Sequence, residues 1–259
     1  MVPARKRKLL SPERELLICR SLADGVKTIS ELGAELGVSE ATVRRDLEQL
    51  ETKGVLRRVH GGAELVSSFR AQEPVYEEKA SLNASEKSRI AELAANYIED
   101  SDTIFLDGGS TVLELAKTLP RKKDLTVVTN SLMAAFELME KECRLVLVGG
   151  EFRKLSRTLV GPLTGKILEN LRINKAFLGT LGFDPEEGLS TTSINEAYTK
   201  ELVMRQSEHV IVLADSSKIG CSSFVRNGAL EDIDILVTDG KIPPGALNIL
   251  KDHNIEVVF

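Results

Sequence analysis

The 259-residue sequence predicts a mixed α/β protein in two parts, a small N-terminal helical domain and a larger α/β domain with a mostly parallel sheet. From residue 103 onward, short apolar runs typical of buried strands alternate with helical stretches. The charged residues are also distributed unevenly along the chain. Residues 1–70 carry 13 Lys or Arg against 10 Asp or Glu, a net of +3, and the remainder carries 21 against 29, a net of −8. A basic N-terminal part followed by an acidic remainder favours a nucleic-acid-binding domain joined to a sensor or an enzyme.

The composition excludes several classes of protein. Hydrophobic residues make up 42% of the chain, which supports a packed core, and no apolar run approaches the roughly 20 residues needed to cross a membrane. The first residues, "MVPARKRKLLSPERE", have a basic cluster without an apolar stretch, so we expect a cytoplasmic protein without a secretory signal. The cysteines have no paired spacing, so neither a disulfide framework nor a metal site is expected, and no cofactor is predicted.

Three helices are predicted at the start of the chain. The first lies in "SPERELLICRSLADG", with Ser11 as its N-cap, Pro12 in its first turn and Gly25 as its stop. The second is "TISELGAELG", and after the turn "GVS" a third helix, "EATVRRDLEQLETKG", is capped by Ser39. Two helices joined by a tight glycine-containing turn form the helix-turn-helix pattern.

The third helix has a face suited to DNA. Its apolar Val43, Leu47 and Leu50 form one narrow stripe. Outside this stripe lie Ala41, Thr42, Arg44, Arg45 and Glu48. In a major groove, arginine favours guanine, and a hydroxyl contacts a base or a phosphate. The alternative is an ordinary solvated charged face.

A short hairpin, the wing, is predicted in "VLRRVHGGAEL". Arg57, Arg58 and His60 would there contact phosphates or a minor groove, although His60 could equally be a plain surface residue. Residues 1–63 are therefore predicted to form a winged helix-turn-helix DNA-binding domain. Residues 64–84 are polar without clear periodicity and are interpreted as a linker, and residues 85–259 form the second domain.

The second domain begins with a helix that starts near residues 83–85 and runs through "EKSRIAELAANYI". Strands are predicted at "TIFLD", "LTVVTN", "RLVLVGG", "KAFLGTLGF", "HVIVLAD", "DILVTD" and "IEVVF". Further helices are predicted from Thr111, at "SLMAAFELME", and around residues 161–171, 193–207 and 244–253. This alternation indicates a layered fold with a largely parallel sheet.

Three successive predicted strands end in small or polar residues. These are Asp107, Gly108, Gly109, Ser110, Thr111, Thr129, Asn130, Ser131, Gly149 and Gly150. Ligands of such sheets bind beyond the carboxyl ends of the strands, so these residues predict a polar small-molecule pocket. In "DGGST", free backbone amides at a helix N-terminus suit a phosphate or a carboxylate. The alternative is a tight turn in which Ser110 is an ordinary cap.

Two groups of motifs resemble a known family. "SEATVRRDLEQLETKGVLRRVHGGA", residues 39–63, resembles the winged helix-turn-helix of the DeoR family of bacterial sugar-metabolism regulators. "DGGST", "GTLGF" and "LADSSK" resemble the effector domain of that family, which is similar in fold to ribose-5-phosphate isomerase. The resemblance implies a repressor of carbohydrate-metabolism genes that binds double-stranded operator DNA and responds to a phosphorylated sugar. It implies DNA-binding roles for Ser39, Thr42, Arg44, Arg45, Arg57, Arg58 and His60.

Four more residues are candidates for the effector site, namely Glu196, Lys200, Asp215 and Lys218. Lys218 would meet a phosphate as a point charge, and Asp215 would accept hydrogen bonds from sugar hydroxyls. An exposed i,i+4 ion pair is the alternative for Glu196 and Lys200. A homodimer or a homotetramer is expected, because one winged helix reads too few base pairs for useful specificity.

The rival function is a sugar-phosphate isomerase fused to a DNA-binding head. Such an enzyme needs a carboxylate base beside the carbonyl. By similarity to the isomerase family, its two acidic positions fall on Leu178 and Leu181 here, and its catalytic glutamate falls on Lys200, or on the neighbouring Glu201 if the alignment shifts by one residue. Leucine cannot transfer a proton, so the sequence predicts a sensor with no catalytic residues, and not an enzyme.

Overall fold

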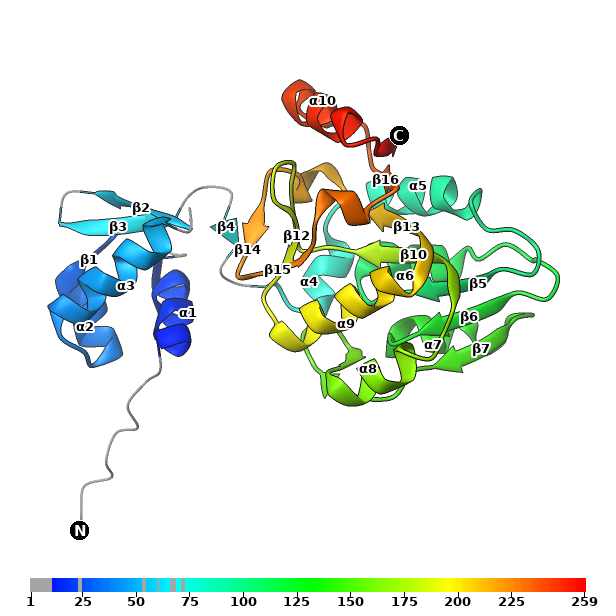
Figure 1. Cartoon of the computed structure of the whole chain (residues 1–259), viewed down its shortest axis with the longest axis horizontal. Helices are drawn as coiled ribbons and strands as arrows, with labels where there is room; N and C mark the ends of the chain where they lie inside the picture. Colours follow the sequence, from blue (N-terminus) through cyan, green and yellow to red (C-terminus); the bar gives the residue numbers. More distant parts are fainter. Residues whose placement is uncertain (1–10, 23–24, 53–54, 60, 66–68, 71–72) are drawn as a thin grey trace, which may run out of the picture. The chain divides into compact units, whose positions relative to one another are not determined.

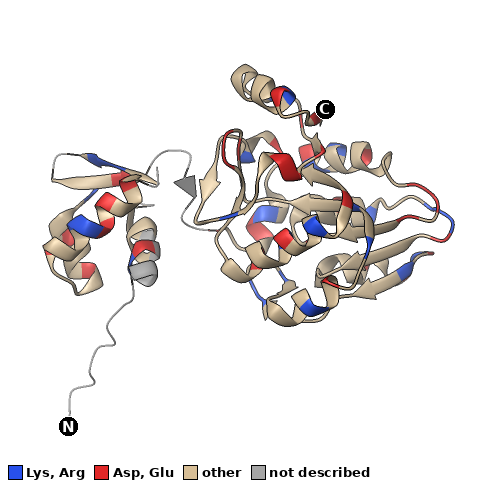
Figure 2. Cartoon of the chain, viewed as in Figure 1, with Lys and Arg blue, Asp and Glu red and all other residues tan. Residues whose placement is uncertain are grey.

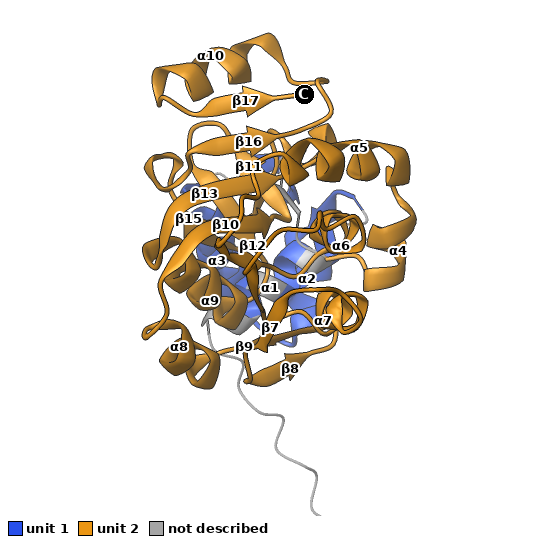
Figure 3. Ribbon diagram, turned by 90° about the vertical axis from the view of Figure 1, so that its right-hand side faces the viewer, with its two compact units in different colours: residues 1–72 blue, residues 73–259 orange. Residues whose placement is uncertain are grey.

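The computed structural model describes residues 11–22, 25–52, 55–59, 61–65, 69–70 and 73–259. His60, a predicted DNA-binding residue, lies outside the described residues. The chain divides into two compact units, residues 1–72 and 73–259 (Figure 3). Among the described residues, no helix combines the length and the apolar character that a membrane span requires.

The first unit contains three helices and a three-stranded antiparallel sheet in the order β1-β3-β2 (Figure 1). Its elements are α1 (Ser11–Leu22), β1 (Lys27–Thr28), α2 (Ile29–Leu36), α3 (Glu40–Thr52), β2 (Leu56–Val59), β3 (Gly62–Leu65) and β4 (Phe69–Arg70). Helix α2 begins with a capping box between Thr28 and Glu31 and ends at Gly37, whose φ of 66° suits glycine. Ser39 Oγ accepts the Thr42 N–H at 3.3 Å. The predicted helix-turn-helix and wing are thus confirmed.

The core of the first unit forms from the predicted apolar stripe of α3. Val43, Leu47 and Leu50 are buried against residues of α1, α2 and β2. Asp46 is also buried on this side of α3, with 1% of its surface exposed, and accepts two hydrogen bonds from Arg14 of α1, at 2.7 and 2.8 Å. This ion pair was not predicted, because its partners lie on different helices.

The second unit is built on a seven-stranded parallel sheet in the order β17-β16-β13-β10-β5-β6-β7. The strands are β5 (Thr103–Leu106), β6 (Thr126–Thr129), β7 (Arg144–Leu147), β10 (Ile173–Gly179), β13 (Ser207–Leu213), β16 (Ile235–Val237) and β17 (Glu256–Val258). The helices are α4 (Tyr76–Ser81), α5 (Ala84–Ala95), α6 (Ser110–Lys117), α7 (Leu132–Leu138), α8 (Pro162–Leu168), α9 (Ile194–Arg205) and α10 (Pro244–Asp252). The predicted parallel α/β fold is confirmed.

Alternating strand residues supply two hydrophobic cores, one on each face of this sheet. Ile104 and Leu106 of β5 pack with residues of α5, α6 and α7. Phe105, between them, packs with residues of α8, α9 and α10 on the opposite face. The strands are therefore covered on both sides, which explains their nearly continuous apolar sequences.

The order of the strands defines a switch point between β5 and β10. From β5 the chain proceeds outward through β6 to β7, and it then returns to β10 on the other side of β5. Connections that leave two neighbouring strands toward opposite sides open a crevice at their carboxyl ends. This crevice is where a ligand of the sheet is expected.

Several short elements escaped sequence analysis. These are β8 (Glu151–Arg153), β9 (Thr158–Val160), β11 (Gly182–Asp184), β12 (Gly188–Thr191), β14 (Ser222–Ser223), β15 (Val225–Gly228) and the 3-10 turns η1 (Ser216–Lys218) and η2 (Leu230–Asp232). The pairs β8–β9, β11–β12 and β12–β15 are antiparallel. Strands this short carry too few residues to show a period of two.

The stretch interpreted as a linker, residues 64–84, differs in the structure. Glu64 and Leu65 belong to β3, and α4 lies within the second unit. Tyr76 is buried in the core of that unit, where the Arg157 guanidinium lies 4.6 Å from its ring centre. A six-residue helix is too short to reveal an apolar face in the sequence. The second unit therefore begins at Glu73.

Candidate functional site

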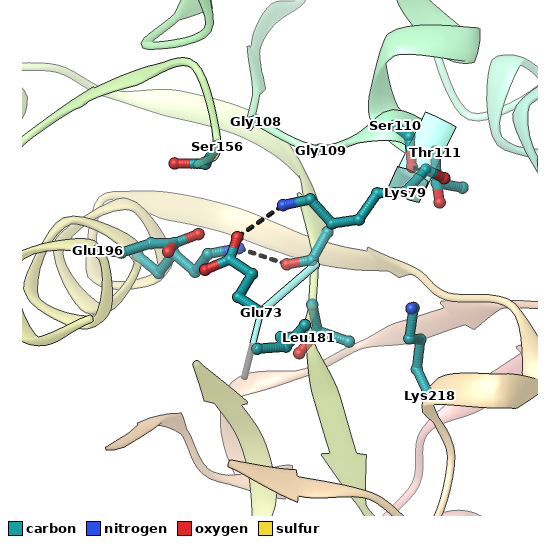
Figure 4. A pocket seen from close by; sticks show the side chains of 13 residues that line it. Glu73, Lys79, Gly108, Gly109, Ser110, Thr111, Ser156, Leu181, Glu196 and Lys218 are labelled. Atoms are coloured by element: carbon teal, nitrogen blue, oxygen red, sulfur yellow. Dashed lines mark hydrogen bonds and ion pairs between the residues drawn. The ribbon is translucent and has the colours of Figure 1, made fainter. Parts of the chain in front are cut away.

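A pocket lies at the switch point of the second unit (Figure 4). Its empty space measures about 520 Å³, the open mouth included. The turns after β5, β10 and β13, together with α9 and the start of the unit, supply its lining. The lining residues are Glu73, Lys79, Gly108, Gly109, Ser110, Thr111, Ser156, Gly179, Thr180, Leu181, Glu196, Lys200 and Lys218.

Asp107 and Lys200 form a buried ion pair beneath this pocket. Lys200 Nζ lies 2.5 Å from Asp107 Oδ2, and the two side chains are 5% and 4% exposed. Lys200 also donates to the Gly179 carbonyl, and the Gly179 N–H donates to Asp107 Oδ2 at 3.2 Å. The pair therefore joins the ends of β5 and β10. Burial lowers the pKa of Lys200, but the nearby carboxylates of Asp107 and Glu196 outweigh it and raise the pKa, so Lys200 is charged.

The alternative of an exposed Glu196–Lys200 pair is wrong, because both residues face the pocket. Glu196 lies 3.4 Å from Arg153 and accepts a hydrogen bond from Thr191 at 3.0 Å. Burial raises the pKa of Glu196, and the carboxylate of Glu73 adds to this effect, whereas Lys200 and Arg153 oppose it. The i,i+4 spacing of Glu196 and Lys200 could not predict that both are largely withdrawn from solvent, because their partners come from other elements.

The turn between β5 and α6 presents backbone amides to the pocket. Gly109 precedes α6 with a φ of 124°, and no side chain caps the helix. The alternative of Ser110 as an ordinary cap is wrong, since its Oγ donates to the Lys79 carbonyl at 3.1 Å. A Cβ on Gly108 would lie 2.0 Å from Thr158 Cγ2, so the turn needs glycine there. The uncapped amides and the positive end of the helix dipole favour an anion.

The turns after β6 and β7 lie outside the pocket lining, contrary to the sequence prediction. The Thr129 hydroxyl donates to the Leu106 carbonyl at 2.6 Å and accepts the Ser131 N–H at 3.0 Å. Ser131 caps α7 through the Ala134 N–H, and Asn130 donates to the Leu159 carbonyl. The hydroxyls of Thr129 and Ser131 are thus bonded to backbone groups, whereas the buried Asn130 Oδ1 has no hydrogen-bond partner in the described part of the chain.

Gly149 and Gly150 are also structural. The Gly149 carbonyl accepts a hydrogen bond from Thr164 at 2.8 Å. A Cβ on Gly150 would lie 1.9 Å from Thr164 Oγ1, so the backbone there passes too close to α8 for a side chain. Asp215 lies outside the lining as well, because its carboxylate accepts hydrogen bonds from Asn83 and from the Ser217 N–H, at 2.9 and 3.1 Å.

Sequence reasoning missed six lining residues, of which Glu73 and Lys79 lie in the stretch read as a linker. The others are Ser156, Gly179, Thr180 and Leu181. The residues "GTL" stand at the carboxyl end of β10, as "DGGST" stands at the carboxyl end of β5. The same argument, that ligands bind beyond the ends of the strands, would have identified them if the sequence had shown that β10 lies beside β5. Leu181 lines the pocket, whereas Leu178 is fully buried in the core.

Apart from His60, the candidate DNA-binding residues of the first unit lie on α3, directly before it, or on β2, and acidic and basic residues are interspersed there (Figure 2). Arg44 lies 3.1 Å from Glu40, Arg57 pairs with Glu64, and Arg58 lies 3.4 Å from Glu48. Arg45 is exposed and forms no ion pair in the described part of the chain. Ser39 and Thr42 share a hydrogen bond of 2.9 Å at the start of α3.

Comparisons with known proteins agree with this architecture. Residues 22–69 match the DeoR-like helix-turn-helix domain, and residues 82–240 match the DeoR C terminal sensor domain. The HTH-type transcriptional regulator GlpR of Haloferax volcanii is 37% identical over 259 residues, which cover 100% of this chain and 98% of that protein. The lactose phosphotransferase system repressor of Staphylococcus epidermidis is 41% identical over 81% of this chain and 84% of its own length.

A third sequence relative and one solved structure also match the chain. The glycerol-3-phosphate regulon repressor of Escherichia coli is 34% identical over 90% of this chain and 92% of its own. The structure of ribose 5-phosphate isomerase A from Methanocaldococcus jannaschii covers 53% of this chain and 55% of that chain, with 19% identity and a TM-score of 0.40. The two domain matches and the full-length relatives establish the family: this chain belongs to the DeoR family of DNA-binding transcriptional regulators.

Proposed function

We propose that the chain is a repressor of carbohydrate-metabolism genes, and that a phosphorylated sugar bound in the pocket of the second unit releases it from its operator. The observation that carries this proposal is the uncapped N-terminus of α6, which opens into a pocket lined by Lys79, Lys200 and Lys218. Amides at a helix N-terminus and lysine side chains together favour a phosphate. The relatives named as repressors of a lactose phosphotransferase system and of a glycerol-3-phosphate regulon support the same class of ligand.

A thermal-shift screen tests the ligand class. Phosphorylated sugars and their unphosphorylated counterparts are compared with the full chain at fixed ionic strength. A ligand of the folded state raises stability by about 2.7 kcal/mol at one hundred times its dissociation constant. We expect phosphorylated sugars to raise the Tm and their counterparts to leave it unchanged. Equal shifts by both members of each pair would contradict a phosphate site.

We propose further that the pocket is not catalytic. An isomerase needs a free carboxylate base. In this pocket Leu181 occupies one position where the isomerase family is acidic, and the lining carboxylates of Glu73 and Glu196 both lie against Arg153. A coupled assay with ribose and ribulose phosphates should show no interconversion above background. Turnover that disappears in Lys200→Ala or Glu201→Ala would contradict the proposal.

For the first unit, we propose that α3 enters the major groove and that the wing contacts the DNA backbone. This assigns the contacts to Ser39, Thr42, Arg44, Arg45, Arg57 and Arg58, and His60 stays a predicted contact outside the described residues. Arg45 is free to read a base, whereas Arg44 must first leave Glu40. Two copies of the chain would read paired half-sites, because one winged helix covers too few base pairs.

Operator binding measured by fluorescence anisotropy tests this assignment. Arg45→Ala should weaken binding by about 1–3 kcal/mol if Arg45 reads a base. Arg44→Ala should weaken it less. Arg121→Ala, which removes an exposed arginine of the second unit, is the matched control and should leave binding unchanged. Unaltered affinity in both α3 variants would remove this helix from the DNA interface.

A further inference from the structure

The carboxylate of Glu73 lies inside the pocket and is held there as a bound anion would be (Figure 4). Both of its oxygens accept hydrogen bonds from the Arg153 guanidinium, one at 3.2 Å. Lys79 Nζ lies 2.6 Å from Oε1, and the Thr192 hydroxyl donates to Oε2 at 2.9 Å. The two-pronged arginine contact is the geometry that arginine also uses for phosphate.

Two cations, Lys79 and Arg153, lie against Glu73, and Arg153 also lies 3.4 Å from Glu196. The side chain of Glu73 is 4% exposed, and those of Lys79 and Arg153 are 14% and 13% exposed, so three ionised groups are largely withdrawn from water. Burial raises the pKa of Glu73, but hydrogen bonds from Arg153 and the charge of Lys79 outweigh it and lower the pKa to about 2. Glu73 is therefore an anion at neutral pH.

The position of Glu73 in the chain connects its contacts in the pocket with the DNA-binding unit. Glu73 is the first residue of the second unit and directly follows the last residue of the first. From Glu73 the chain continues into α4, whose Lys79 contributes both its ammonium group to Glu73 and its carbonyl to Ser110. Glu73 therefore connects the pocket to the point in the chain where the first unit ends.

We propose that Glu73 is an internal competitor of the ligand: Arg153 and Lys79 together hold either Glu73, in the empty protein, or the phosphate of the effector, in the bound one. This inference rests on the proposed function and adds its mechanism of regulation. Arg153 and Lys79 become ligands of the phosphate, which frees Glu73 and the backbone before α4. The ligand binds only the form in which Glu73 has left, so it shifts the population toward that form.

Glu73→Gln tests the competition, because it keeps the shape of the side chain and removes its charge. The probe is inorganic phosphate, titrated calorimetrically into the full chain with chloride at equal ionic strength as the reference. A binding-competent form populated at about 10% or less lowers the apparent affinity at least tenfold. We therefore expect Glu73→Gln to bind phosphate at least about tenfold more tightly than wild type. Glu77→Gln, which removes an exposed carboxylate from α4, should bind as wild type does.

The outcomes separate the two proposals. Equal or weaker phosphate binding by Glu73→Gln would overturn the competition alone, provided that wild type binds phosphorylated sugars. Failure of both proteins to bind phosphate and phosphorylated sugars would overturn the proposed function as well. Arg153→Met, made in the Glu73→Gln background so that the Glu73 carboxylate is not left buried without its arginine, should abolish the gain. Retention of the gain would show that Arg153 does not hold the phosphate.

Hydrogen exchange measures the release of the backbone. Adding phosphate to wild type should accelerate amide exchange in residues 75–82, and Glu73→Gln should show faster exchange before any phosphate is added. The exchange of α7, which lies outside the pocket lining, serves as the internal reference. Binding of phosphate without any change in residues 75–82 would overturn the proposed release.

Discussion

The turns that follow β5 and β6 have similar sequences and different roles. Both place hydroxyl residues at the start of a helix on neighbouring parallel strands. After β6, the Thr129 hydroxyl is bonded to the backbone of Leu106 in β5 and of Ser131, and the Ser131 hydroxyl is bonded to the backbone of α7. After β5, α6 has no side-chain cap, and the Thr111 hydroxyl makes no hydrogen bond in the described part of the chain.

The position of each strand explains the difference. The turn after β5 faces the end of β10 across the switch point, where the two connections separate. Strand β6 lies between β5 and β7, and the β8–β9 hairpin packs against its turn through the bridge between Ser131 and Thr158. Strand-end residues are thus available to a ligand only where the crevice opens.

The largest expected effect comes from the buried charge under the β5 turn, which the β6 turn lacks. Lys200→Met leaves the Asp107 carboxylate buried without its partner. The free energy of unfolding should fall by about 3–5 kcal/mol, as measured by urea denaturation. The double variant Lys200→Met with Asp107→Leu should recover part of this loss. A loss below about 1 kcal/mol in the single variant would show that the pair is not an essential part of the pocket floor.

Acid should weaken the pocket through Glu73. Its pKa is lowered from 4.5 to about 2, so its contribution to stability is present above pH 4.5 and is lost as the pH falls toward 2. The stability difference between wild type and Glu73→Gln should therefore shrink on acidification, by at most about 1.4 kcal/mol per pH unit. Urea unfolding between pH 6 and 3 measures this difference. A difference independent of pH would contradict the ionic role of Glu73.

A matched pair of threonine variants contrasts the two turns directly. Thr129→Val removes a buried hydroxyl with two backbone partners and should cost about 1–3 kcal/mol of stability without changing the response to the effector. Thr111→Val removes a pocket hydroxyl and should change stability by less than about 0.5 kcal/mol while weakening effector binding. Denaturation and effector titration of both variants test the pair. The reverse pattern would place the ligand at the β6 turn.

Sequence patterns predicted the three helices and the wing of the first unit and the parallel strands of the second, but only part of the pocket. Apolar runs located the strands of the parallel sheet, and caps such as Ser39 located the helices of the first unit, because these signals are local. The charged contacts of the pocket are not local. Asp107 and Lys200 are 93 residues apart, and Glu73 and Arg153 are 80 apart. Such partners are brought together by the order of the strands in the sheet, and no single segment of the sequence predicts that order.

The central claim is that the turn after β5 receives the phosphate of the effector. It is tested most directly by Gly109→Asp, with Gly109→Ala as the control. Both variants put a Cβ at a φ of 124°, where no heavy atom of the described residues lies within 4 Å of it, so they share any backbone strain and differ in charge.

The measurement is operator binding by anisotropy with and without the phosphorylated sugar that gives the largest thermal shift in wild type. Melting curves confirm that each variant is folded. Gly109→Asp should bind the operator as wild type does and no longer release it when the sugar phosphate is added, whereas Gly109→Ala should still respond. A folded Gly109→Asp protein that releases DNA at the wild-type ligand concentration would contradict the claim, and the phosphate would have to bind elsewhere.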